Sequence, residues 1–140
     1  QAADVVSVSD IADQDVAVLR VRGYRGPAVR DIDWQGRGAA QGSPAALIGF
    51  PRGSELAFDT SGYVRTTMFA GIIAKATPQW IQFGGITVRG SSGSPIFNAE
   101  GQVIAIHYGG LSDGPILGFA VPMARVRRWL PAEARAELGL

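Results

Sequence analysis

The sequence predicts an all-β fold, because short apolar runs alternate with turn residues along most of its length. Nineteen glycines and eight prolines are spread through the 140 residues. Short runs rich in β-branched and aromatic residues, bounded by such turn residues, are typical of strands in a sandwich or barrel. Five runs fit this pattern: Val16–Val21, Ala45–Phe50, Trp80–Phe83, Val103–Tyr108 and Ile116–Val121.

Two other kinds of segment complete the organisation. Residues 98–101 (Asn-Ala-Glu-Gly) lie between two apolar runs and predict a hairpin turn. Residues 22–43 are polar and glycine-rich, which indicates a linker. Helical spacing appears near the end, where Met123, Val126 and Leu130 follow Pro122 at intervals of three and four. We therefore expect a C-terminal helix, with a further helical turn in 131–140.

The composition argues against several classes of function. Thirteen basic and twelve acidic residues give a net charge of +1, so we expect no nucleic-acid partner. The absence of cysteine excludes disulfides and thiolate chemistry, and with a single histidine we expect no metal site and no cofactor. No apolar run approaches about 20 residues, so we expect no membrane span.

Residues 89–95 (Arg-Gly-Ser-Ser-Gly-Ser-Pro) have the composition of a turn that carries a nucleophile. Acyl transfer needs a serine on a tight turn with backbone N–H groups aimed at the developing oxyanion. Gly90 would let its own N–H and that of Ser92 point into one pocket, and Gly93 would let the chain turn sharply. The alternative interpretation is a plain glycine-serine turn between strands.

This serine motif and the strand after it, through residues 103–110, resemble the trypsin-like (chymotrypsin-fold) serine peptidases. The resemblance is strongest to the bacterial branch of staphylococcal-type glutamyl endopeptidases. Residues 15–21 (Asp-Val-Ala-Val-Leu-Arg-Val) look like the strand that carries the triad aspartate. Residues 46–53 resemble the first strand and turn of the second barrel, and 118–122 resemble the end of such domains.

The resemblance implies a double antiparallel β-barrel, with the N-terminal barrel only partly present, and a C-terminal helix. Residues 1–22 would be closing strands of the N-terminal barrel, and 23–43 an inter-barrel linker. Residues 44–121 would form the C-terminal barrel with the nucleophile and the S1 pocket, and 122–140 the helical segment.

The resemblance also implies catalytic roles. Ser92 would attack the scissile carbonyl, while the N–H groups of Gly90 and Ser92 would form the oxyanion hole. Asp15 would accept a hydrogen bond from the catalytic imidazole and fix its tautomer. The alternative for Asp15 is a solvated carboxylate like its neighbours Asp10 and Asp13.

The same resemblance predicts a substrate pocket. In the glutamyl branch a histidine and a threonine bind an acidic P1 side chain, and His107 and Thr87 stand at the matching places. Both side chains can donate hydrogen bonds to a carboxylate. Backbone groups of Tyr108 and Gly109 would pair with the substrate as an added strand. The alternative for His107 is a packed residue without a substrate role.

The sequence departs from the family at the catalytic histidine, which precedes the aspartate in the chymotrypsin order. None of the 14 residues before Asp15 is a histidine. We therefore expect a companion N-terminal fragment or segment that carries it, and no activity from this chain alone.

The predicted function is a serine endopeptidase acting on peptide or protein substrates, with a possible preference for Glu or Asp at P1. The first alternative is an inactive pseudo-peptidase that acts as a peptide-binding or scaffold module. A second is a chaperone-like peptidase of the high-temperature-requirement type. The resemblance to secreted relatives predicts an exported (extracellular or periplasmic) location.

Overall fold

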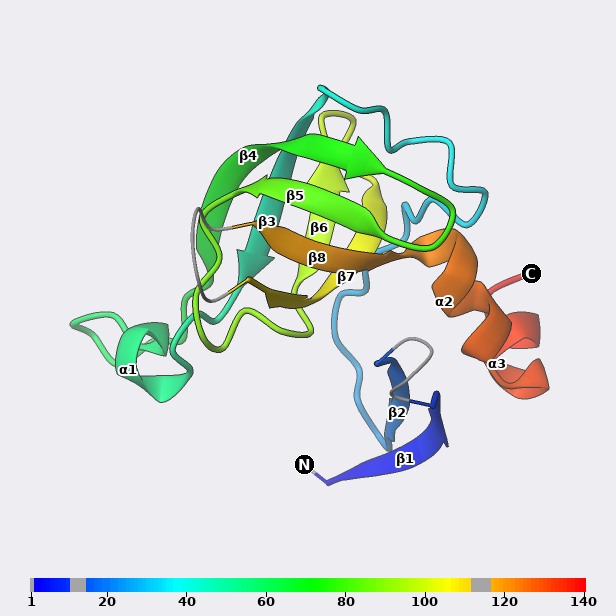
Figure 1. The fold of residues 1–140 in the computed structure, drawn as a ribbon. Helices are drawn as coiled ribbons and strands as arrows, with labels where there is room; N and C mark the ends of the chain where they lie inside the picture. Colours follow the sequence, from blue (N-terminus) through cyan, green and yellow to red (C-terminus); the bar gives the residue numbers. More distant parts are fainter. Residues whose placement is uncertain (1, 11–14, 112–116) are drawn as a thin grey trace.

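The computed structural model describes residues 2–10, 15–111 and 117–140, which form two sheets and three short helices (Figure 1). In the first sheet, β1 (Ala3–Val8) pairs antiparallel with β2 (Ala17–Val21). The second sheet is a closed antiparallel barrel in the order β3-β4-β5-β8-β7-β6. Its strands are β3 (Pro44–Gly49), β4 (Thr67–Ala76), β5 (Ile81–Gly85), β6 (Pro95–Asn98), β7 (Val103–Gly110) and β8 (Gly118–Pro122). The helices are α1 (Ser54–Ala57), α2 (Met123–Trp129) and α3 (Ala132–Glu137).

The all-β prediction is confirmed, and the predicted runs coincide with strands to within one or two residues. Residue 116, the start of the last predicted run, lies outside the described residues. The predicted hairpin turn is also present, because the Gly101 N–H donates to the Asn98 carbonyl at 3.1 Å. The predicted C-terminal helix is present as α2, and the further turn forms α3.

Strand β4 was not predicted from the sequence. Its ten residues include alanines, a glycine and a lysine, which are uncommon in strands, and they show little alternation of polar and apolar side chains. Tertiary packing explains the strand instead. Gly71 in β4 faces the Phe83 ring of β5, and a Cβ at Gly71 would lie 2.8 Å from that ring. The glycine therefore makes room for a fully buried phenylalanine.

The interior of the barrel is filled with aliphatic and aromatic side chains from all six strands. Such filling is typical of small barrels, which are packed cores rather than channels. The cluster consists of Ala45, Leu47, Ile73, Ile81, Phe83, Ile96, Ile104, Ala105 and Ala120. This core gives the loops at the barrel end a rigid base.

The β1–β2 sheet lies outside the barrel, beside α2 and α3 (Figure 1). The Ser7 hydroxyl donates to the Trp129 carbonyl at 2.7 Å, and Arg20 forms an ion pair with Glu137 at 3.2 Å. Apolar side chains nevertheless stay exposed on this sheet, with Val5 and Val8 at 64% and 60% exposure. The sheet is thus anchored to the C-terminal helices but has uncovered apolar surface.

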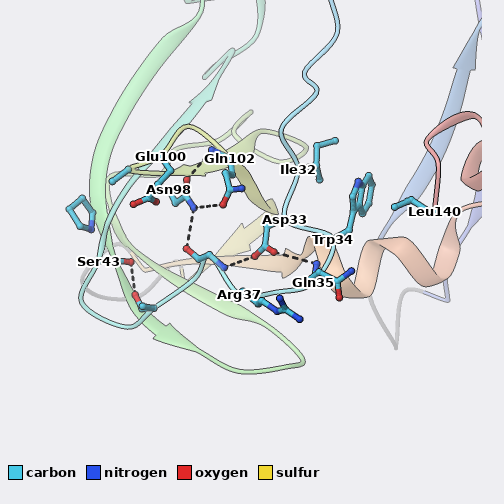
Figure 2. Close-up of a pocket in the computed structure, with 14 residues that line it drawn as sticks. Ile32, Asp33, Trp34, Gln35, Arg37, Ser43, Asn98, Glu100, Gln102 and Leu140 are labelled. Carbon is cyan, nitrogen blue, oxygen red and sulfur yellow. Dashed lines mark hydrogen bonds between the residues drawn. The ribbon is translucent and has the colours of Figure 1, made fainter.

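A buried carboxylate closes part of the linker into a loop, which other hydrogen bonds hold against the barrel (Figure 2). Asp33 accepts hydrogen bonds from the N–H groups of Gly38 at 2.7 Å and Gln35 at 3.3 Å. The Asn98 amide, from the β6–β7 turn, donates to the Gly38 carbonyl at 3.4 Å. These groups border a cavity of about 640 Å³. None of the predicted site residues lines this cavity, and its hydrogen bonds serve to fix the linker.

Candidate active site

Ser92 lies on an exposed turn between β5 and β6, and its hydroxyl donates to the Tyr108 carbonyl at 3.1 Å. Gly90 (φ 92°) and Gly93 (φ 85°) on either side have left-handed backbone conformations that favour glycine. The Gly93 N–H donates to the His107 carbonyl at 2.8 Å. The turn is therefore fixed to β7 by main-chain contacts, and the Ser92 side chain stays at the surface.

The two N–H groups expected to form the oxyanion hole are both unpaired. Within the described ranges, neither the Gly90 N–H nor the Ser92 N–H donates a hydrogen bond, whereas the Ser91 N–H between them donates to Val88. Free donors on a fixed turn can stabilise negative charge that develops on a carbonyl oxygen. The turn therefore has the donors that acyl transfer needs.

Strand β7 carries a bulge beside this turn. Its pairing with β8 shifts register between His107 and Gly109, which leaves Tyr108 without a directly opposite residue. Such bulges re-aim side chains and main-chain groups and occur often next to active sites. The last β6–β7 pair is Pro95 with Ile106, so the end of β7 has no strand partner on that edge. A peptide could add there as a strand.

Asp15 lies just before β2, exposed, in a left-handed conformation (φ 50°). Burial raises the pKa of Tyr108, and the negative charge of Asp15 raises that pKa further. The neighbouring Val16 packs into the same cluster as Tyr108 and Ile106. Asp15 thus lies within electrostatic reach of Tyr108, whose carbonyl accepts the hydrogen bond from the Ser92 hydroxyl.

His107 is buried in β7, with 3% exposure, and neither ring nitrogen hydrogen-bonds to a described residue. Burial lowers the pKa of His107; backbone groups of Ser91 and Gly109 approach the ring and oppose part of this shift. A buried polar group without a partner is costly unless a ligand satisfies it. The buried ring is thus compatible both with the predicted binding role and with the packed alternative.

Thr87 and His107 both pack closely against Gly118 in β8. A Cβ at Gly118 would lie 2.8 Å from Thr87 Cγ2 and 3.1 Å from His107 Nε2. The missing side chain of Gly118 therefore lets the threonine and the imidazole approach this strand together. Gly110 lies beside the same threonine, since its Cβ would be 3.4 Å from Thr87 Oγ1.

The structure therefore gathers the predicted residues into two neighbouring groups. Ser92, Gly90 and Tyr108 form one, with Asp15 within electrostatic reach of Tyr108. His107 with Thr87 forms the other, and Gly109 lies on the open edge of β7. Sequence reasoning did not identify Gly118, which Thr87 and His107 approach closely. The available signal was a glycine at the start of an apolar strand, which often marks a close approach of a ligand or another chain.

Ser92 also borders a second, mainly apolar cavity of about 450 Å³. Its lining includes Gly90 and Gly93 but neither His107 nor Thr87. A ligand bound across the serine turn could therefore contact this apolar cavity.

In the part of the chain that the structure describes, no three His, Asp or Glu side chains gather as a metal centre would require. None of the described helices is long and apolar enough to cross a membrane.

Comparison with known proteins shows the family of the chain. The family described as "Trypsin-like peptidase domain" matches residues 1–106. A pro-apoptotic serine protease of Aspergillus niger is 28% identical over 114 residues, which are 78% of this chain and 11% of that protein. A glutamyl endopeptidase of Staphylococcus epidermidis is 63% identical over 27 residues, 19% of this chain and 10% of that protein. The chain thus spans about a tenth of these relatives.

Solved structures share the fold. A serine endoprotease from Yersinia pestis has a TM-score of 0.72 at 24% identity, covering 90% of this chain and 42% of that one. An inactive serine-to-alanine mutant of a Mycobacterium tuberculosis protein has a TM-score of 0.64 at 20% identity, covering 97% of this chain and 65% of that one. The mostly β architecture with short C-terminal helices is the one seen in these structures.

Proposed function

The chain belongs to the trypsin-like peptidase domain family, and from this premise we propose that it is part of a serine endopeptidase working through an acyl-enzyme. Ser92 attacks the scissile carbonyl, and the N–H groups of Gly90 and Ser92 hold the oxyanion. The observation that carries the proposal is an exposed serine on a fixed turn whose two candidate oxyanion donors are unpaired.

The general base comes from outside these 140 residues in this proposal. The single histidine of the sequence is His107, whose ring lies at Gly118 and makes no hydrogen bond to Ser92. Asp15 would orient that imidazole, and the effect of its charge on Tyr108 supports this role. Exposed Val5, Val8 and Leu19 offer apolar surface to a companion segment that completes the first sheet. Export from the cell remains a prediction, based on the resemblance to secreted peptidases.

We propose further that His107 and Thr87, beside Gly118, bind an acidic P1 side chain. A carboxylate is acceptor-only when ionised, so it could pair with a ring N–H of His107 and the hydroxyl of Thr87. It would satisfy an imidazole that has no other partner among the described residues. The 27-residue match to a glutamyl endopeptidase supports the same preference.

A binding experiment tests the pocket without requiring turnover. The peptide Ala-Ala-Ala-Glu should bind the chain about tenfold more tightly than Ala-Ala-Ala-Gln, because hydrogen bonds to a charged group are about twice as strong as neutral ones. Isothermal titration measures both peptides. In a His107→Leu variant the preference should vanish. Equal binding of both peptides to the wild type would refute the acidic pocket.

Mass spectrometry tests the catalytic serine. The purified protein is measured under denaturing conditions before and after treatment with a fluorophosphonate probe. A companion fragment together with a single adduct on Ser92 is the result expected of a working peptidase. A lone chain that takes no adduct would contradict a peptidase assembled from this chain and a co-purifying fragment.

One observation favours a second candidate, a peptide-binding module without catalysis. The Ser92 hydroxyl donates to a main-chain carbonyl, which cannot accept its proton during attack. A chain that binds the glutamate peptide yet takes no adduct, even with a histidine-bearing companion present, would be such a module.

A further inference from the structure

A loop after β3 holds the peptide between Arg89 and Gly90. The main-chain N–H of Arg52 donates a hydrogen bond to the Arg89 carbonyl at 2.8 Å. No cis peptide bond occurs in the described residues, and in a trans peptide the C=O and N–H point in opposite directions. The Gly90 N–H therefore points away from Arg52, and Gly90 lines the cavity that contains Ser92.

The backbone of this loop is specialised for that contact. Arg52 has φ 58°, a left-handed conformation that is uncommon for a residue with a side chain. Gly53 follows with φ 57° and ψ −130°. On the other side of the contact, a Cβ at Gly90 would lie only 2.7 Å from the Arg52 nitrogen. Both partners thus adopt conformations that allow a close approach of one main chain to the other.

We propose that the main-chain N–H of Arg52 positions the oxyanion hole, by holding the 89–90 peptide so that the Gly90 N–H joins that of Ser92. This inference rests on the proposed function and adds a positioning residue to it. The Arg52 guanidinium is paired with Glu55 at 2.7 Å and takes no part. Without the anchor the peptide is free to rotate, and the Gly90 donor is presented in only a fraction of the molecules.

The hydrogen bond itself can be measured on the full chain by NMR. A scalar coupling between the amide nitrogen of Arg52 and the carbonyl carbon of Arg89 reports it directly, independent of any activity. The wild type should show this coupling and slow exchange of the Arg52 amide. Absence of both would overturn the inference.

Three substitutions separate the backbone from the side chain. R52G and R52N keep the N–H and tolerate the left-handed conformation, whereas R52V keeps the N–H but strongly disfavours that conformation. The coupling should persist in the first two variants and disappear in the third. R52G and R52N also serve as controls for loss of the ion pair with Glu55.

The functional readout compares Ala-Ala-Ala-Glu as a free acid with the same peptide as a C-terminal amide. The terminal carboxylate carries the negative charge that the oxyanion donors favour, so the wild type should prefer the acid. Loss of one such donor costs about 10²- to 10³-fold on a full transition-state charge, so we expect roughly tenfold on this product-like group. R52V should lose the preference for the acid, while R52G and R52N keep it.

The two proposals fail in distinguishable ways. The preference for glutamate over glutamine tests the His107 pocket, and it should be the same in all three Arg52 variants. The preference for acid over amide tests the oxyanion hole. An R52V variant that retains the acid preference and the coupling would overturn the role of Arg52. An R52V variant that loses the glutamate preference as well would show general disruption and would also count against a specific positioning role.

Discussion

The hydroxyl of Ser92 donates a hydrogen bond to the carbonyl of Tyr108 at 3.1 Å, across the bulge in β7. This contact joins the nucleophile turn to the strand segment that has an open edge. A carbonyl oxygen holds the serine proton but cannot remove it, so in the proposed mechanism the hydroxyl turns to an imidazole before it attacks. Asp15, whose charge acts on Tyr108, would orient that imidazole in the same proposal.

Replacing Ser92 by alanine should abolish fluorophosphonate labelling and leave stability within about 0.5 kcal/mol of the wild type, because the side chain is exposed. Ser91 is the matched control: it is 0% exposed, and its hydroxyl accepts from the Val88 N–H at 3.3 Å. Ser91→Ala should lower the free energy of unfolding by about 1 kcal/mol. Mass spectrometry and urea denaturation measure both effects. Labelling that persists in Ser92→Ala would place the nucleophile elsewhere.

Gly118→Ala should disturb the proposed binding of an acidic side chain. The new Cβ would lie 2.8 Å from Thr87 Cγ2 and 3.1 Å from His107 Nε2, so these side chains must shift from the positions in which they would bind a carboxylate. We expect at least a tenfold loss of affinity for Ala-Ala-Ala-Glu, since the acid must give up a charge-assisted hydrogen bond. Titration of the variant measures it. Labelling of Ser92 by a small probe that stays out of the pocket should be unaffected, and unchanged peptide affinity would show that the acid binds elsewhere.

Much of the barrel could be predicted from local pattern, because β3, β5, β7 and β8 each carry an apolar run next to turn residues. Strand β4 could not, since its alanines and Gly71 fit the barrel through the bulk of Phe83, a contact remote in sequence. The structure of the linker could not be predicted for the same reason. In the sequence Asp33 looks like any other polar residue. Its structural role appears only in the fold, where the N–H groups of Gly38 and Gln35 donate to its carboxylate.

The candidate site likewise has residues that could be predicted from the sequence and residues that could not. Gly90, Ser92 and Gly93 are adjacent in sequence, and their residue types alone indicate a tight turn with free N–H groups. The contributions of Arg52 and Gly118 depend on loops and strands that meet only in the fold. Arginine at a left-handed position carries no sequence signal, because that conformation is set by its main-chain contact with Arg89.

The contact between Ser7 and Trp129 should anchor the β1–β2 sheet to the C-terminal helices. Ser7→Ala removes a partly buried hydrogen bond of 2.7 Å, and we expect a loss of about 1 kcal/mol. Arg22→Ala is the control: its ion pair with Asp4 lies within the sheet and is exposed, so its loss should cost well under 1 kcal/mol. Hydrogen exchange of the β1–β2 amides should rise in Ser7→Ala alone. Equal exchange in the two variants would contradict this anchoring.

His107 should make the stability of the chain depend on pH in the range where no other side chain of the sequence ordinarily titrates. Burial lowers the pKa of His107 in the folded state below its usual value. The unfolded chain therefore binds a proton more readily than the folded chain as the pH falls through about 6.5. The free energy of unfolding is at its full value above that pH and declines as the pH drops toward the folded-state pKa.

Urea denaturation at intervals between about pH 7.5 and 5.5 measures this decline. His107→Leu should flatten the profile, since leucine has no proton to bind, and should raise stability at acidic pH by removing two unpaired ring nitrogens from the interior. Saturation with Ala-Ala-Ala-Glu should oppose the decline in the wild type, because a bound carboxylate favours the protonated imidazole. A wild-type profile as flat as that of the leucine variant would mean that the His107 pKa is not lowered by folding.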